Sequence, residues 1–358
     1  MPDFAQLRLV ADTTGLKQGI TALDDVVKAG GRAETATTKT GHSFEKAGRD
    51  AQASTAKVEG FSRGLKSVAG IAAGMAGALA AAFSVRAIIS GISEFETSMS
   101  KVQAISGATG ATLTELRDIA KDLGSTTEFS AAQAADGLSF LAMAGFSAQE
   151  SLSAIPAVMD LATASGMGLA AAADTASNIM SGFGIAASDA ASVADVLAAA
   201  SSRANTDVAQ LGSAMSTVAP IAATLGISLE DTASAIGVMS DAGIQGERAG
   251  TALRGVLASL AGPTKAAEDA LAKYHLKAKD VNPELHSLAD IMTTLRERGL
   301  STADAMTIFG REAASGALVL AGSSDRLSEF GDELRSASGA AADMAGTMRD
   351  NLGGDIKG

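Results

Sequence analysis

Three short stretches that begin with glycine recur at nearly even intervals along the chain. The glycines lie 39 and 42 residues apart, an apolar residue follows each, and a small or helix-capping residue comes third: Gly145-Phe146-Ser147, Gly184-Ile185-Ala186 and Gly226-Ile227-Ser228. A glycine can take the left-handed conformation that ends one helix, and the apolar residue can anchor the turn into the next. Self-similarity near 40 residues is typical of stacked helical hairpins. We therefore predict an array of short antiparallel helices in which Gly145, Gly184 and Gly226 are structural joints.

The amino-acid composition favours an all-α fold. Hydrophobic residues make up 47% of the 358 residues, but much of this share is alanine, and aromatic residues contribute only 3%. Alanine is the best helix former, and the long alternating or β-branched runs of strands are nearly absent. The 39 glycines weaken helix interiors, which favours several short helices. We expect the function to depend on length and surface rather than on a pocket.

Charge is distributed unevenly along the chain, whose formal net charge is -12. Lys and Arg number 11 against 8 Asp and Glu in residues 1–90, 6 against 17 in residues 91–262, and 11 against 15 in the remainder. Tight binding to nucleic acid requires clustered basic side chains. The acidic middle therefore predicts no specific nucleic-acid binding.

Residues 1–67 are predicted to form a strand and a helix followed by a polar segment. Alternating apolar and polar side chains predict one short strand within residues 4–11, and a helix is expected over residues 15–29. Residues 30–66 are polar, and two interpretations fit them, a long solvated helix or a disordered segment.

An apolar run rich in alanine and glycine follows, and we expect a long helix within residues 68–93. Val68 to Val85 is a run of 18 residues without a charged side chain, which just reaches the length of a membrane-spanning helix. Glycines at small-xxx-small spacing would let two such helices approach closely; they are Gly70, Gly74 and Gly77. Alanine and glycine provide little free energy of insertion, so a buried helix of a soluble protein is the alternative.

Residues 94–262 are predicted to be the helical core with the 40-residue repeat, and residues 263–358 a C-terminal helical subdomain. A capping residue answered three places later by an acid or amide marks a helix start, as at Thr112, Ser130, Ser147, Ser228 and Ser301. Gly262-Pro263 interrupts the pattern, so the boundary is placed there. Further helices are expected near residues 264–275, 284–298, 302–321 and from 324 onward. No closing element follows, which indicates a fragment of a longer protein.

No pattern of residues predicts an enzyme. Gly60-Phe61-Ser62-Arg63-Gly64 matches the nucleophile-elbow pattern, but neither a preceding strand nor an activating His–acid pair is found for Ser62. The spacing of four acids does not match a calcium loop, and we interpret them as solvated or helix-end acids; they are Asp160, Asp174, Asp189 and Asp195. The histidines are too scattered for a metal site; they are His42, His275 and His286. We expect no catalytic residue, metal site or cofactor.

Several sequence blocks, taken in order, resemble the core region of phage tail tape-measure proteins. The resemblance covers roughly residues 90–325, and the order of the blocks is more specific than any one of them. The N-terminal strand, polar stretch and apolar segment also resemble the front of such proteins. The blocks are Glu94-Phe95-Glu96, Thr127-Glu128-Phe129-Ser130, Leu141-Ala142-Met143-Ala144-Gly145-Phe146, Asp195-Val196-Leu197-Ala198, Val218-Ala219-Pro220, Ala242-Gly243-Ile244-Gln245-Gly246-Glu247-Arg248-Ala249-Gly250-Thr251-Ala252-Leu253-Arg254 and Ile308-Phe309-Gly310-Arg311-Glu312-Ala313-Ala314.

The resemblance implies a structural protein that occupies the lumen of a growing phage or prophage tail tube, fixes its length and leaves ahead of the DNA. Its implied location is the virion tail, after assembly in the host cytoplasm. Its implied partners are the tail tube protein, tail assembly chaperones, distal tail or baseplate proteins and further copies of itself. Members are commonly much longer than 358 residues.

Two other functions are compatible with the sequence. The first is a membrane-inserting channel or ejection protein that acts on the host membrane through residues 68–85. The second is a cell-wall hydrolase fragment that would depend on Ser62 or on an acid. The single tyrosine and the absence of tryptophan disfavour the second, because a carbohydrate-stacking surface is missing.

Overall fold

The computed structural model describes residues 90–350 of a chain that divides into two compact units, Met1–Ser93 and Glu94–Gly358. Helices supply all the regular structure of the described residues, and none of these residues lies in a strand. The prediction of an all-α array is thus confirmed. The strand, helix and polar segment expected in residues 1–67, and residues 68–89 of the long helix expected within residues 68–93, fall outside the described part.

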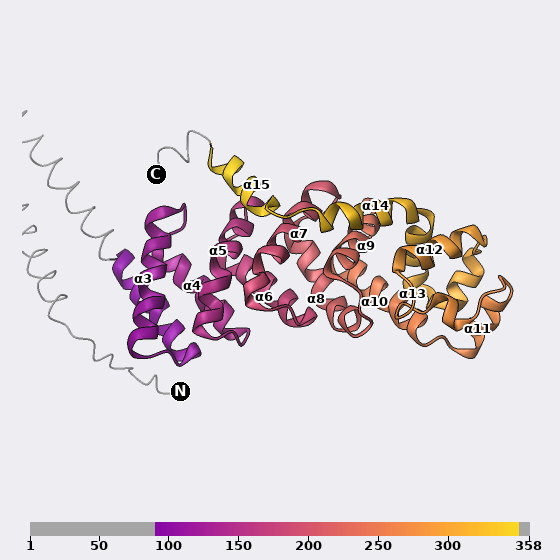
Figure 1. Cartoon of the computed structure of the whole chain (residues 1–358), viewed down its shortest axis with the longest axis horizontal. Coiled ribbons are helices and arrows are strands. Elements are labelled where there is room, and N and C mark those ends of the chain that lie inside the picture. The colour runs from indigo at the N-terminus through magenta and orange to yellow at the C-terminus, as the bar shows by residue number, and fades with distance from the viewer. Residues whose placement is uncertain (1–89, 351–358) are drawn as a thin grey trace, which may run out of the picture. The chain divides into compact units, whose positions relative to one another are not determined.

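The described helices follow one another along the array in Figure 1, after a helical segment over residues 90–106. They are α3 (Gly110–Thr126), α4 (Ala131–Met143), α5 (Ala148–Ser165), α6 (Leu169–Phe183), α7 (Ala190–Arg203), α8 (Val208–Thr224), α9 (Leu229–Asp241), α10 (Glu247–Ala261), α11 (Lys265–Ala272), α12 (Leu288–Glu297), α13 (Thr302–Gly322), α14 (Ser324–Arg335) and α15 (Ala340–Arg349), with short 3₁₀ turns η2 (Ala187–Asp189) and η3 (Ala278–Val281).

Each helix from α4 to α8 packs against the helix two places further along the chain, and α10 packs against α13. One row runs through α4, α6, α8, α10 and α13, and a second row runs through α5, α7 and α9. Neighbouring hairpins therefore bury each other's apolar faces, as in other stacked helical repeats. The sequence period of about 40 residues corresponds to one helix from each row.

Gly145, Gly184 and Gly226 lie where the chain leaves α4, α6 and α8, with φ angles of 93°, 67° and 70°. At each turn the N–H of the next residue donates to a carbonyl five residues earlier, Phe146 to Leu141, Ile185 to Met180 and Ile227 to Ala222, at 2.8–3.2 Å. This is the Schellman arrangement, which satisfies carbonyls that the helix end leaves open. Similar turns at Gly166, Gly243 and Gly299, also of positive φ, were not among the expected joints.

We expect Gly226→Ala to lower the free energy of unfolding by about 1–2 kcal/mol, because an L-residue in the left-handed region is strained by roughly that amount. No neighbouring atom lies within 4 Å of a Cβ added there, so the cost comes from the backbone alone. Urea unfolding of the full chain measures it. Gly226→Asn is the matched control and should cost less, since asparagine tolerates this conformation. Equal costs for the two variants would contradict this explanation.

Side-chain caps set most of the predicted helix starts. Ser130, Ser147, Ser228 and Ser301 each accept the N–H of the residue three places on. Thr112 does not cap a helix: α3 begins at Gly110, so this threonine lies inside its first turn and the prediction there is wrong. Thr112 and Glu115 match the capping pattern, but the helix already begins two residues earlier, at Gly110.

The helical array continues past Gly262-Pro263, which lies between α10 and α11. Residues on both sides of this pair belong to the Glu94–Gly358 unit, and α13 packs against α10. α13 itself bends at Gly310, whose φ of 76° and ψ of 167° are not helical. Only glycine takes this conformation readily.

After α13 the chain reverses direction and runs back along the array. α14 packs against α9 and α12, and α15 packs against α5 and α7, so the last described helices cover the row of α5, α7 and α9 (Figure 1). We call residues 323–350 the return segment.

Candidate functional site

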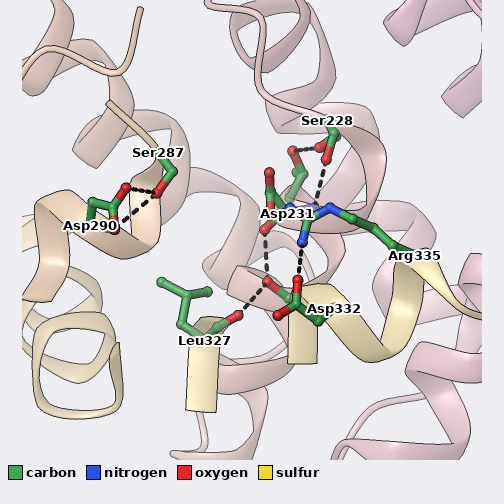
Figure 2. Close-up of polar contacts among 9 residues, drawn as sticks. Ser228, Asp231, Ser287, Asp290, Leu327, Asp332 and Arg335 are labelled. Carbon is green, nitrogen blue, oxygen red and sulfur yellow. Dashed lines mark hydrogen bonds and ion pairs between the residues drawn. The ribbon is translucent and has the colours of Figure 1, made fainter. Parts of the chain in front are cut away.

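The contact between α9 and α14 fixes the first half of the return segment. Arg335 forms an ion pair with Asp231 of α9 and a second one, of 2.8 Å, with Asp332 of its own helix (Figure 2). The hydroxyl of Ser234 donates to the carbonyl of Leu327 at 3.3 Å. Phe330 is fully buried in this contact. Both apolar packing and charge therefore hold α14 in place.

Asp195 holds the start of α15 from the middle of α7. Its carboxylate accepts the backbone N–H of Gly339 at 2.7 Å and that of Ala341 at 2.9 Å. These groups lie at the N-terminal end of α15, where N–H groups lack helical partners and the helix dipole favours a negative charge. Asp195 is only 8% exposed. It thus acts as a helix cap supplied by a residue 144 positions away.

Arg349 holds the other end of α15. Its guanidinium donates to Glu128 at 2.9 Å, to Asp160 at 3.2 Å and to the hydroxyl of Thr163 at 3.2 Å. Thr163 in turn donates to Glu128. Burial raises the pKa of Glu128, but the hydrogen bonds from the Thr163 hydroxyl, from the backbone N–H of Glu128 and from Arg349, together with the charge of Arg349, outweigh it and lower the pKa of this carboxyl. The last turn of α15 is thereby joined to α5 and to the residues that precede α4.

These contacts correct the interpretation of two of the four acids as solvated or helix-end groups. Asp195 is buried and Asp160 is paired with Arg349. Asp174 is an exposed residue that accepts from the side chain of Asn178, and Asp189 lies in η2 just before α7. The apolar residues on either side of Asp195 in the sequence were the one feature that could have indicated its burial. No local sequence pattern indicated that Arg349 would hold the C-terminal end of α15, as Asp195 holds its N-terminal end.

A second polar cluster ties α11 to the start of α13. The carboxylate of Asp304 accepts from Lys273 at 2.6 Å, from the hydroxyl of Tyr274 at 2.7 Å and from Ser301 at 2.8 Å. These three donors, Lys273 first, lower the pKa of Asp304 from 3.8 to about 2. Its position is fixed by the same serine that caps α13.

We expect the Asp304 cluster to weaken in acid. A carboxyl whose pKa is lowered by folding contributes stability above its unfolded pKa, and this contribution is lost as the pH falls from 3.8 toward 2. An NMR titration of the full chain should give an Asp304 pKa near 2, and Lys273→Met should raise it toward 3.8. Lys265→Met, which removes a lysine paired with Glu268 and Asp269 on α11, should leave the Asp304 pKa unchanged.

A shallow, open hollow of about 540 Å³ lies on the surface of α3. Three acids line it, Glu115, Asp118 and Asp122, beside Ala111, Thr114 and Ile119. Across residues 90–350, no group of three or more His, Cys, Asp or Glu side chains could hold a metal ion. His275 and His286 lie in the turns between α11 and α12, while His42 and Ser62 fall outside the described residues.

In the same part of the chain, no single helix combines the length and apolar composition needed to cross a membrane. Only α5 and α6 taken together pass these two criteria, and they meet at a bend of 117°. Val68 to Val85, with Gly70, Gly74 and Gly77, lies outside the described residues, so its expected membrane role stays a prediction.

Comparison with known proteins gives consistent matches over this array. The family model for the phage-related minor tail protein matches residues 117–311. The tape measure protein of Pneumococcus phage Dp-1 is 38% identical over 271 residues, which cover 74% of this chain and 24% of that protein. The probable tape measure protein of Escherichia phage P2 is 37% identical over 139 residues, 36% of this chain and 17% of that protein. The chain thus spans a quarter or less of these relatives. No solved structure matches.

Proposed function

This chain belongs to the phage-related minor tail protein family, and we propose that it is part of a tape-measure protein that sets the length of a phage or prophage tail. The observation that carries the proposal is the match to proteins of that name over the folded array. Apolar packing and ion pairs hold the helices of the array to one another, and this arrangement supports a structural role.

The folded structure of the array limits the ways in which this chain could set the length of a tail. A single extended helix converts residue number into length at about 1.5 Å per residue. In this array, however, Arg349 contacts Glu128 although 221 residues separate them. A compact array cannot act as a ruler in that way. We therefore propose that residues 94–350 form an assembly module and that length is measured by other parts of the tape-measure protein.

The first test is electron microscopy of tails made by a phage whose gene for this chain carries a stop codon within α3. We expect no tails of uniform length, because the factor that sets their length is missing. Tails of normal and uniform length would contradict the tape-measure function. Detection of the intact chain in purified tails by mass spectrometry is the accompanying measurement, and its absence there would also contradict the proposed location.

The second test asks whether the array is compact in the tail. An in-frame deletion of Gly145 to Phe183 removes 39 residues, namely α5, α6 and the turns around them, and joins α4 to the turn at Gly184. If the array were stretched as helix, tails would shorten by about 60 Å. We expect tails of unchanged length or none at all. Shortening would contradict the compact module but support the tape-measure function.

The partners of this module are proposed to be other tail components: the tail tube protein, assembly chaperones, distal tail or baseplate proteins and further copies of the chain. Occupation of the tube lumen and release ahead of the DNA belong to the same proposal. The negative charge of residues 91–262, with 6 basic against 17 acidic residues, would limit adhesion to DNA in a shared channel. Tight binding of the purified chain to duplex DNA at physiological salt would contradict this part.

A membrane-inserting ejection role remains a second candidate because Val68 to Val85 lacks any charged side chain. It would be a later state of the same protein rather than a separate function. Protease digestion of the chain mixed with liposomes tests it. Protection of residues 68–85 is expected if they insert, and complete cleavage within them would exclude insertion.

A further inference from the structure

The two helices of the return segment are attached to the array in different ways. α14 buries Leu327, Phe330 and Leu334 against its neighbours. α15 fully buries only two alanines, Ala341 and Ala345, and Ala340 and Met344 are partly buried beside them. Alanine removes little apolar surface from water. The attachment of α15 to the array therefore depends on polar contacts to a greater degree than the attachment of α14 does.

The polar contacts of α15 lie at its two ends. Asp195 caps the N-terminal end through Gly339 and Ala341, and Arg349 closes the C-terminal end on Glu128, Asp160 and Thr163. Both charges match the helix dipole, an acid at the start and a base in the last turn. Each end of α15 is therefore held by a charged contact, while the apolar packing between the ends comes from alanines and the partly buried Met344.

α15 has little tendency to stay helical when it leaves the array. It has ten residues, and isolated helices of that length are marginal in water. Gly346 weakens it further, since this glycine is exposed and has no neighbouring atom within 4 Å of the position of a Cβ. Docking and helix formation are thus one event. The linker over residues 336–339 contains Gly339 at a φ of 86°, which gives α15 a joint that is independent of α14.

We propose that α15 is a detachable latch. It opens and unfolds as a unit while α3 to α14 stay folded, and its opening uncovers the faces of α5 and α7 on which it rests. When closed, it ties the last described turn of the chain to the region of α4 and α5. The latch is a property of the folded chain, so the latch proposal can be tested independently of the proposed tape-measure function.

Hydrogen exchange of the full-length chain, followed by mass spectrometry, tests the latch. In Arg349→Gln, we expect the amides of residues 341–349 to exchange at least tenfold faster, while those of α8 and α10 keep their rates. In Gly346→Ala, the same α15 amides should exchange about two- to fivefold slower, because alanine favours the helix. Arg296→Gln removes a bidentate pair with Asp325 of α14 and should leave α15 unchanged.

Two results would overturn the proposal. Equal acceleration throughout α3 to α14 in Arg349→Gln would mean that α15 opens only with the whole array. Unchanged exchange of α15 in both Arg349→Gln and Gly346→Ala would mean that neither the terminal anchor nor helix formation controls its opening. Gly346→Ala retains every contact of the native chain, so it tests the latch even if Arg349→Gln fails to fold.

Discussion

Replacement of Phe330 by alanine is expected to lower the free energy of unfolding by about 3–5 kcal/mol, the usual cost of removing a fully buried phenylalanine. Phe330 has no exposed surface and packs where α14 meets α9. The guanidinium of Arg326 lies 4.4 Å from the centre of its ring, so a cation–π contact is lost as well. Chemical denaturation of the full chain measures the change. Phe183→Ala, at a half-buried position, should cost clearly less.

A double-mutant cycle locates the effect at this contact. A Cβ atom added at Gly237 of α9 would collide with the ring of Phe330. We therefore expect Gly237→Ala to destabilise the native chain but to be tolerated when Phe330 is already alanine. Residues in contact give such non-additive changes. Additive costs would show that the two positions do not share one packing site.

Gly250→Ala is expected to have the second-largest effect, a loss of about 1–3 kcal/mol. Gly250 lies in α10, where this helix crosses α8. A Cβ atom added there would lie 2.5 Å from the carbonyl oxygen of Ala214 and 2.8 Å from its Cα. These are backbone atoms of a packed helix, so they cannot move aside as a flexible side chain could. The two helices would have to separate along the whole contact.

The sign of this effect distinguishes packing from helix propensity. In a helix interior, Gly→Ala normally stabilises by about 0.5–1 kcal/mol, and Gly322→Ala at the end of α13 is the matched control because nothing lies near its added Cβ. Differential scanning calorimetry of both variants should show a lower midpoint for Gly250→Ala and no loss for Gly322→Ala. A rise for both would contradict the close approach of α8 and α10.

Different parts of the array are held together in different ways: α15 by charged contacts, the α8–α10 crossing by small residues, and α14 by a large aromatic anchor. Tight helix crossings such as that at Gly250 depend on small residues, which explains why a chain with 3% aromatic residues forms a continuous buried core. Large anchors such as Phe330 are few, and each carries more stability. We therefore expect stability to vary along the array, lowest at α15 and highest in the central rows, as in other stacked repeats.

Local features of the structure could be predicted from the sequence because neighbouring residues decide them. A helix cap needs a serine and the N–H three places on, as at Ser130, Ser147 and Ser228. The turns at Gly145 and Gly184 need only a glycine and the end of one helix. The 40-residue period then predicts the hairpin array, since each unit repeats the same local pattern.

The tertiary structure alone decided where the return segment lies and which residues hold it. Asp195 and Gly339 are 144 residues apart, and Arg349 and Glu128 are 221 residues apart. In the sequence alone, Asp195 had the same interpretation as three other acids, and Arg349 had none. Their roles arise only when the chain reverses after α13 and brings α15 onto α5 and α7. Such pairings depend on which faces the packed rows leave available, and no local pattern of residues encodes that choice.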